Sequence, residues 1–258
     1  AKGTPWHPHR GFETVTYLLE GTFRHRDSHG GGGVIGEGDT QWMTAGSGIL
    51  HIERPIDEIV AKGGVVHGVQ IWVNLPKAQK MTAPRYQEVK AGDVTEVTDD
   101  DGTKVRIICG EYWGRRGPVE GIAADPQYLD IWVPPNVERT LPVARSRNAF
   151  AYVFEGDGRF HAASEPGAVL TDRVAEGGRL DDDSARLDTD VANRSLTVFD
   201  AGDEIRLRAG EHGMRFLLVS GAPIREPIAW YGPVVMNTRE ELQQAFAQLR
   251  AGTFLDIR

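Results

Sequence analysis

Cysteine, long apolar runs and clustered positive charge are all scarce in this sequence. The single cysteine among 258 residues, Cys109 in the run VRIICG, excludes an internal disulfide, and its apolar neighbours predict a buried structural thiol. No stretch reaches the roughly 20 apolar residues of a membrane span, and the first residues lack the apolar segment of a signal peptide. We therefore expect a cytoplasmic protein without membrane contact.

Signatures of phosphate and acyl chemistry are also missing. The net charge is −8, and no Lys/Arg block is long enough to follow a phosphate backbone, so direct nucleic-acid binding is not expected. The chain has no Gly-rich phosphate loop in a strand-to-helix context and no nucleophile elbow. Nucleotide and acyl-transfer functions therefore have no support.

What the sequence does contain is glycine, proline and short apolar runs. Thirty-one glycines and fourteen prolines separate segments such as TVTYLLEG, GVQIWVNLP, YLDIWVPP, AFAYVFEG and MRFLLVSG. This pattern predicts an all-β fold built from short strands and tight turns.

One helix is expected, at the C-terminus. Thr238 and Glu241 form a capping box, and Gly252 stands where the helix should end. Between them runs one apolar stripe, made of Leu242, Ala245, Phe246 and Leu249. We expect this helix to dock on the β-structure as a lid or brace.

An internal repeat predicts two copies of one β module. The segment YLLEG at 17–21 returns as YVFEG at 152–156, and the landmark GD(x)5AG at 38–46 returns at 202–210. We expect one domain over residues 1–85, without its first strands in this sequence, and a second over 93–258 that includes the helix. The second copy carries an acidic insertion near residues 165–194, interpreted as a solvent-exposed loop.

Two histidine-containing pairs stand out in the first copy. His7 and His9 alternate along one predicted strand and therefore face the same side, and His51 and Glu53 repeat this spacing at the end of another apolar run. On facing strands the two pairs would present three imidazoles and one carboxylate to one point, which predicts a metal site.

The repeat supplies an internal control for this prediction. Aligned on the shared landmarks, the second copy has Pro142 and Ala144 in place of the first pair, and Arg215 and Leu217 in place of the second. The second module is expected to fold without these four groups, so structural need does not explain them in the first.

The ligand set of nitrogen and oxygen without sulfur suits several divalent ions. Fe(II) with exchangeable positions is the first choice, and nickel, copper, zinc and manganese stay open. Exchangeable positions would admit dioxygen or an oxygen-bearing small-molecule substrate. Glu53 has a second possible use, as a base that takes a proton from a substrate hydroxyl.

Four segments of the chain resemble the pirin family of bicupin proteins: HPHRGFETVTYLLEG, GDTQWMTAGSGILHIERP, GVQIWVNLPKAQKMTAPRYQ and EPIAWYGPVVMNTREE. The resemblance implies two cupin barrels of the jelly-roll (double-stranded β-helix) type. It also implies that His7, His9, His51 and Glu53 bind a single iron in the N-terminal cupin, while the C-terminal cupin has lost its metal. Glu13, where other cupins keep a ligand carboxylate, is expected to support the site by hydrogen bonding.

Two functions follow from the resemblance. One is a quercetin 2,3-dioxygenase activity, in which a flavonol or related enol-bearing substrate reacts with O2. The other is a non-catalytic, iron-dependent redox regulator that binds a transcription factor or a metabolic enzyme. Fold does not decide between them.

The remaining candidates have mainly structural interpretations. Trp42, Met43 and His67 could shape the metal pocket, although core positions are the commoner use of such residues on strands. His25 and His29, beside a run of four glycines, are interpreted as parts of an exposed mobile hairpin, with a role in gating the metal pocket as the alternative. His161 and His212, in the second copy, are expected to be exposed.

Overall fold

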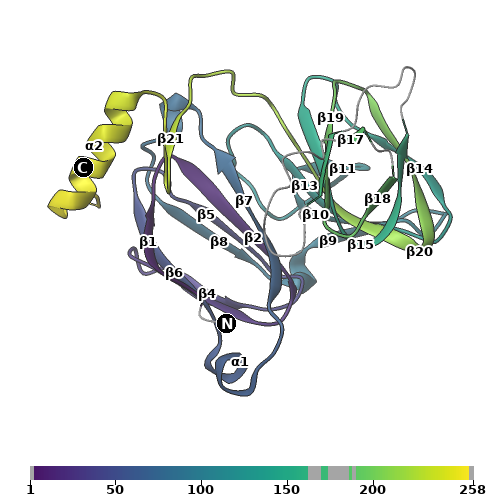
Figure 1. Ribbon diagram of the computed structural model, residues 1–258, viewed down its shortest axis with the longest axis horizontal. Helices are drawn as coiled ribbons and strands as arrows, with labels where there is room; N and C mark the ends of the chain where they lie inside the picture. The colour runs from purple at the N-terminus through teal and green to yellow at the C-terminus, as the bar shows by residue number, and fades with distance from the viewer. Residues whose placement is uncertain (1–2, 162–169, 174–185, 188–189, 256–258) are drawn as a thin grey trace. The chain divides into compact units, whose positions relative to one another are not determined.

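Short strands that end at glycine-rich turns make up nearly all of the regular structure (Figure 1). The computed structural model describes residues 3–161, 170–173, 186–187 and 190–255. They form two compact units: the first unit is Ala1–Asp93 with Ile224–Arg258, and the second unit is Val94–Pro223. The predicted all-β fold with a C-terminal helix is confirmed, and the acidic insertion lies largely outside the described residues.

The first unit contains two four-stranded antiparallel sheets, in the orders β1-β6-β3-β4 and β7-β2-β5-β8, and a hairpin of β21 with β22. The bounds are β1 Thr4–His9, β2 Phe12–Glu20, β3 Phe23–Asp27, β4 Gly32–Ile35, β5 Thr40–Thr44, β6 Ile49–Pro55, β7 His67–Asn74, β8 Arg85–Val89, β21 Ala229–Tyr231 and β22 Val234–Met236. Both histidine-bearing segments of the sequence therefore lie on neighbouring strands of one sheet.

The second unit is built on one large antiparallel sheet with a small hairpin, β11 and β12, beside it. The bounds are β9 Thr95–Thr98, β10 Lys104–Cys109, β11 Glu111–Tyr112, β12 Arg115–Arg116, β13 Gln127–Val133, β14 Glu138–Pro142, β15 Asn148–His161, β16 Leu170–Arg173, β17 Arg186–Leu187, β18 Asp190–Ala192, β19 Ser195–Phe199 and β20 Glu204–Gly221. Its interior is filled by buried apolar side chains, among them Leu129, Ile131 and Phe216. Cys109 is buried, as predicted.

The C-terminal helix α2 (Arg239–Ala251) forms as the sequence predicts. The Thr238 hydroxyl accepts a hydrogen bond from the Glu241 backbone N–H at 3.2 Å, and the Glu241 carboxylate accepts one from the Thr238 N–H at 3.0 Å. Gly252 ends the helix in the left-handed conformation, with φ of 74°. The apolar stripe packs on Val234, Met236 and Phe254. The helix therefore belongs to the first unit, whereas the expected division placed it in a second domain of residues 93–258.

A buried arginine ties this C-terminal segment to the strand that carries the first histidine pair. Arg10 directly follows His9, and its guanidinium donates to the Ser47 carbonyl, the Gln248 side-chain oxygen and the Phe254 carbonyl, each at 2.6 Å. It also lies 4.0 Å over the Phe254 ring. Burial lowers the pKa of Arg10 to about 10, so the group stays charged at neutral pH.

A buried lysine makes a second connection at the same place. The Lys80 ammonium donates to the carbonyls of Gly11 and Val235 at 2.9 and 3.0 Å and to the Asn74 side chain at 2.7 Å. Gly11 has a φ of +85°, and a Cβ there would collide with the Val235 carbonyl, so the close approach requires glycine. The chain after the first histidine pair is thus held by residues from the far end of the sequence.

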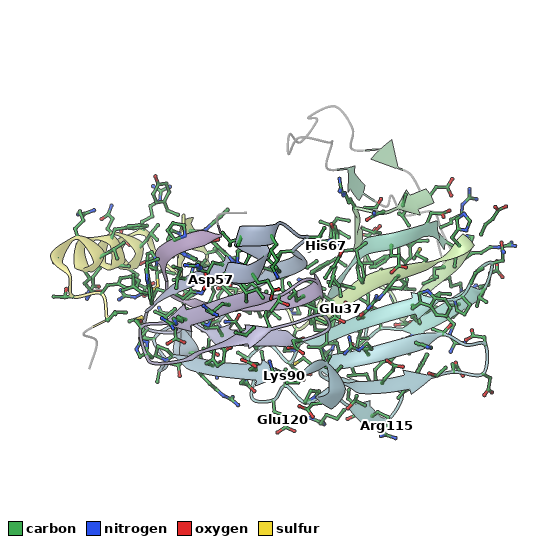
Figure 2. All side chains as sticks on the ribbon, turned by 90° about the horizontal axis from the view of Figure 1, so that it is seen from below. Glu37, Asp57, His67, Lys90, Arg115 and Glu120 are labelled. Atoms are coloured by element: carbon green, nitrogen blue, oxygen red, sulfur yellow. The ribbon has the colours of Figure 1, made fainter. Side chains whose placement is uncertain are left out.

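A short helix, α1 (Asp57–Lys62), is an addition to the predicted elements. Its first residue is Asp57, which Figure 2 labels. Asp57 forms exposed ion pairs with Arg24, at 3.5 Å, and with Arg54. Pairs of this kind contribute little to stability. Neither α1 nor α2, the α-helices of the described residues, is long and apolar enough to cross a membrane.

Strand pairing shows which positions of the two units correspond. In the first unit β6 pairs with β1 through His7 opposite His51, and with β3 through His25 opposite Glu53. In the second unit the first part of β20 pairs with β14 and with the last part of β15 in the same way, through the pairs Leu141 with Ile205 and Phe160 with Leu207. The interior positions His7, His9, His25, His51 and Glu53 therefore correspond to Leu141, Val143, Phe160, Ile205 and Leu207.

This register corrects the alignment made from the sequence landmarks. That alignment placed Pro142, Ala144, Arg215 and Leu217 at the positions of the four predicted ligands. For Arg215 and Leu217 it fails because the Gly-Asp landmark of the first unit precedes β5, whereas that of the second unit precedes β20, whose first part is the counterpart of β6. Pro142 and Ala144, aligned on the Glu-Gly landmark, each lie one residue beyond the counterpart that the register gives. The corrected counterparts are all apolar, so the conclusion drawn from the repeat is strengthened.

Candidate metal centre

Three of the four predicted ligands come together inside the first unit. His7 and His9 alternate along β1 and face the same side, and His51 on β6 lies opposite His7 in the register. The potential ligand atoms of the three rings all lie within 4.8 Å of one another. The Nε2 atoms of His7 and His51 are 2.7 Å apart. Two neighbouring strands thus aim three imidazoles at one point.

Burial keeps the inner rings of this cluster neutral. The pKa of His9 is lowered to about 3 and that of His51 to about 2, mainly because burial disfavours the charged ring and also because other imidazoles stand close by. A neutral imidazole has one bare nitrogen available to a cation. Both residues are therefore ready as ligands at any physiological pH.

The nitrogens of the three rings have different polar neighbours. Nδ1 of His7 lies 2.7 Å from the Pro5 carbonyl, and Nδ1 of His51 lies 3.0 Å from Nε2 of His25. The Pro233 carbonyl acts to raise the pKa of His9, although neither nitrogen of that ring has a hydrogen-bond partner of ordinary geometry among the described residues. Buried ring nitrogens without partners are a feature that a bound cation would explain.

Glu53, the fourth predicted ligand, stands beside the histidines and outside the group that lies within 4.8 Å. It is buried two residues after His51 on β6, and its carboxylate accepts hydrogen bonds from Gln70 Nε2 at 2.9 and 3.1 Å and from the Thr16 hydroxyl at 3.5 Å. Burial raises its pKa, while the Gln70 hydrogen bond and the charge of His7 act in the opposite direction. The structure therefore holds this carboxylate at the edge of the cluster with a raised proton affinity.

Strand β7 forms the open side of the cluster. Gln70 and Trp72 share one face of this strand, so that Gln70 reaches Glu53 and the Trp72 ring lies 5.4 Å from the ring of His9. Trp72 also packs on Phe12, with ring centroids 4.4 Å apart, yet it is 43% exposed. A partly exposed aromatic ring therefore stands directly beside His9.

Glu13 does not reach the histidine cluster. On β2 it alternates with Thr16, so the two side chains face opposite sides of the strand, and Thr16 is the one that contacts Glu53. The Glu13 carboxylate accepts a hydrogen bond from the Thr44 hydroxyl at 2.6 Å, and burial raises its pKa. The expected supporting role fails because the strand's alternation turns this carboxylate away.

Trp42 and Met43 are both core residues, as their commoner use predicts. In the register of β2 with β5, Trp42 lies opposite Val15 on the side of Glu13, away from the cluster. Met43 lies on the other side and packs with Tyr86, whose ring stacks on that of His25 at 5.2 Å. Only Met43 is thus on the side of the cluster.

Three further histidines lie on the surface. His67 begins β7 opposite Glu20 and is exposed, so its interpretation as a buried histidine is wrong (Figure 2). It also falls on the strand face opposite that of Gln70 and Trp72. His161 and His212 are exposed, as predicted.

His25 is the residue that sequence reasoning missed. It was interpreted as part of an exposed hairpin with His29, but its side chain is 1% exposed and contacts His51, whereas His29 is exposed. The signal was present in the alternation of the run FRHRD, in which two arginines flank His25 and point outward. The adjacent glycine run instead favoured the interpretation of this segment as an exposed hairpin.

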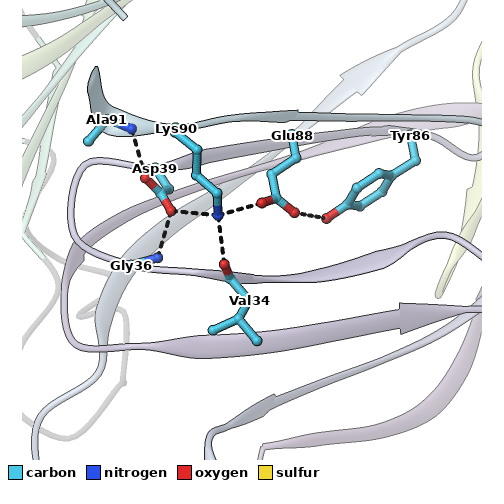
Figure 3. A network of polar contacts seen from close by, with 7 residues as sticks. All are labelled: Val34, Gly36, Asp39, Tyr86, Glu88, Lys90 and Ala91. Carbon is cyan, nitrogen blue, oxygen red and sulfur yellow. Dashed lines mark hydrogen bonds and ion pairs between the residues drawn. The ribbon is translucent and has the colours of Figure 1, made fainter. Parts of the chain in front are cut away.

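Tyr86, whose ring stacks on that of His25, belongs to a polar network that Figure 3 shows. The Tyr86 hydroxyl donates to Glu88 at 3.0 Å, Glu88 forms an ion pair with Lys90, and Lys90 also pairs with Asp39 at 3.1 Å. Burial and the Glu88 hydrogen bond raise the pKa of Tyr86, so this phenol stays protonated. The network fixes the ring on which His25 stacks.

Two antiparallel β-units of matching topology, one with a histidine cluster inside it, define a bicupin. The chain belongs to the pirin family: the family's Pirin model matches residues 1–73 and its Pirin C-terminal cupin domain model matches residues 128–255. The predicted resemblance and the bicupin fold are confirmed.

Relatives along the whole chain agree with this assignment. A pirin-like protein of Caulobacter vibrioides is 40% identical over 98% of this chain and 80% of its own length. A pirin-like protein of Solanum lycopersicum is 39% identical over 97% of this chain and 76% of its own. The crystal structure of quercetin 2,3-dioxygenase from Acinetobacter baumannii superposes with a TM-score of 0.82 at 34% identity, covering 98% of this chain and 79% of that one.

Proposed function

We propose that the first unit binds one divalent metal ion and supports a quercetin 2,3-dioxygenase type of reaction. His7, His9 and His51 would hold the ion, and Glu53 would complete the set or stand beside it as a base. The observation that carries this proposal is the cluster of three imidazoles, two of them with strongly lowered pKa values, at positions where the second unit has apolar residues.

The donor set fits the metals that the sequence suggested. Imidazole nitrogen with carboxylate oxygen and no sulfur suits Fe(II), our first choice, and also nickel, copper, zinc and manganese. When bound, such an ion supplies Lewis-acid chemistry and a means of bringing dioxygen and substrate together. The lone buried cysteine fits a reducing compartment, so the cytoplasm is our proposed location.

The chain's own residues supply orientation and proton transfer. The exposed part of Trp72 beside His9 offers a flat flavonol an aromatic surface for stacking. The Glu53 carboxylate would take the proton of the substrate's 3-hydroxyl, and its raised pKa brings it nearer the working pH of a general base. Gln70 holds the carboxylate in place through two hydrogen bonds.

Oxygen consumption with quercetin tests the proposal. The chain would be loaded anaerobically with Fe(II), mixed with quercetin in aerated buffer, and followed by an oxygen electrode and by loss of flavonol absorbance. We expect turnover in the wild type, none in His51→Ala, and a rate about 10² to 10⁴-fold lower in Glu53→Gln, because the base is lost.

Glu13→Gln is the matched control, since it removes a buried carboxylate on the opposite face of β2 and keeps the oxygen that accepts from Thr44. Its rate should stay near that of the wild type. An iron-loaded wild type that consumes no oxygen with quercetin would contradict the enzymatic proposal and favour the redox-dependent binding of a protein partner.

A further inference from the structure

A chain of hydrogen bonds runs from the Pro5 carbonyl through His7 and His51 to His25. The three contacts measure 2.7, 2.7 and 3.0 Å, and they use both nitrogens of His7 and of His51 but only Nε2 of His25. Nδ1 of His25 is buried without a hydrogen-bond partner among the described residues. Each contact needs one proton, and three neutral rings carry three.

The Pro5 carbonyl fixes the order of these protons because it can only accept. His7 must then carry its proton on Nδ1, which leaves Nε2 bare to accept from Nε2–H of His51. Nδ1 of His51 is bare in turn and accepts from Nε2–H of His25. The nitrogen left without a proton is Nδ1 of His25, the one nitrogen of these three rings that has no hydrogen-bond partner among the described residues. In the metal-free arrangement each of the three contacts therefore has one donor and one acceptor.

A cation held by Nε2 of both His7 and His51 requires the protons to sit on different ring nitrogens. His7 already has a bare Nε2, but His51 must move its proton to Nδ1, and His25 must then accept that proton's hydrogen bond through a bare Nε2. The Nε2 proton of His51 leaves to solvent, the Nε2 proton of His25 passes to Nδ1 of His51, and a solvent proton binds Nδ1 of His25. The charge of the three rings does not change.

The surroundings of His25 suit this exchange. Burial lowers the pKa of His25 to about 4 and keeps the ring neutral, while the charges of Asp27 and Glu88 act in the opposite direction. His25 is also among the residues that line an open hollow of about 520 Å³, together with Trp6, Arg24 and Val34. The stacked Tyr86 keeps the plane of the ring fixed during the exchange.

We propose that His25 is a positioning residue that sets the tautomer of His51, donating to it in the metal-free protein and accepting from it when a divalent cation is bound. This inference rests on the metal site of the proposed function. At the corresponding position the second unit has Phe160, an aromatic ring that can neither donate nor accept.

Two substitutions separate the hydrogen bond from the packing. His25→Phe keeps a ring against Tyr86 but removes both donor and acceptor, whereas the amide of His25→Gln can donate or accept by rotating. His29→Gln is the matched control, because His29 is exposed on the same hairpin. The probe is Zn(II) alone, which is diamagnetic and allows ring-¹⁵N histidine spectra of the holoprotein.

We expect the wild-type spectra to show His25 and His51 protonated on Nε2 without Zn(II) and on Nδ1 with it. Zn(II) affinity should fall roughly 10 to 100-fold in His25→Phe, less than about tenfold in His25→Gln, and stay unchanged in His29→Gln. If His25→Phe fails to fold, the spectra of the wild type and of His25→Gln decide.

Two results would overturn this role of His25 while leaving the metal site intact: a metal-free His51 already protonated on Nδ1, or a folded His25→Phe that binds Zn(II) as tightly as the wild type. A wild type that binds no Zn(II) and no other divalent ion would overturn the metal site and this role together. The outcomes for the two proposals are therefore distinguishable.

Discussion

The two units place opposite kinds of side chain at the same interior positions. Where the first unit has His51 and Glu53 on β6, the second has Ile205 and Leu207 on β20, and where the first has His25 the second has Phe160. A buried polar group costs stability unless it is hydrogen-bonded, and a buried charge costs more. The second unit shows that this fold is complete with an apolar interior, so the polar interior of the first has a use other than folding.

The comparison also explains why the first unit needs additional support. Its cluster includes buried ring nitrogens that have no hydrogen-bond partner in the described part of the chain, and its β7 side leaves Trp72 exposed. The C-terminal segment compensates by packing α2 and the Arg10 and Lys80 hydrogen bonds around the end of β1. The second unit holds its interior with a continuous apolar cluster instead.

Replacing His51 with isoleucine, the residue at the corresponding position of the second unit, should have the largest effect. His51→Ile removes a predicted ligand and leaves an apolar side chain of the kind that β20 carries, so divalent-metal affinity should fall more than about 100-fold, beyond the loss typical of outer-sphere partners. Folding of the metal-free chain should be unharmed, because the buried imidazole is replaced by an apolar group. Equilibrium titration with Fe(II) under anaerobic conditions measures the loss, and His212→Gln, exposed in the second unit, is the control.

The converse change should destabilise the second unit without creating a site. Leu207→Glu places an unpaired carboxylate in the apolar interior and should lower the free energy of unfolding by about 3 kcal/mol or more. Val198→Glu, at a position 54% exposed on β19, should change it by less than about 0.5 kcal/mol. Urea unfolding compares the two variants. If Leu207→Glu left the free energy of unfolding unchanged, the interior of the second unit would be able to accommodate a buried carboxylate.

A smaller difference is expected in acid. In the metal-free first unit the pKa values of His9, His25 and His51 are lowered from 6.5 to about 3, 4 and 2, chiefly by burial. Below pH 6.5 the unfolded chain therefore binds more protons than the folded one, and stability falls as the pH drops. The raised pKa values of Glu13 and Glu53 act in the opposite direction, but only two carboxylates do so, against three imidazoles.

The second unit has no counterpart to these buried rings, since His161 and His212 are exposed. Between pH 6.5 and 5 the hydrogen-exchange protection factors of the first unit should therefore fall, while those of the second stay constant. Equal loss of protection in both units would contradict the role given to the buried histidines.

Much of this arrangement could be predicted from the sequence because it depends on local patterns. The capping box of Thr238 with Glu241, and the shared face of His7 and His9, follow from spacing alone. Glu13 was misjudged because a position in a motif does not show which face of β2 is the interior. His25 was missed because a neighbouring glycine run suggested mobility, and its contact with His51 depends on the pairing of β3 with β6.

The counterparts in the second unit show a further limit of sequence reasoning. A short landmark such as Gly-Asp can recur at different turns of the same fold, so the alignment placed Arg215 and Leu217 where the register places Ile205 and Leu207. The number of residues between strands varies, and only the hydrogen-bonded ladder fixes the correspondence. Likewise, the connection of α2 with the first unit depends on long-range contacts of Arg10 that no local pattern indicates.

Counting the metal ions bound per chain tests the central claim most directly. The wild type and His51→Ile would be equilibrated anaerobically with Fe(II), freed of unbound metal, and assayed for iron and protein. We predict one ion per wild-type chain, bound by the first unit, and none in the variant. A wild type without bound iron, or a variant that keeps its ion, would contradict the account.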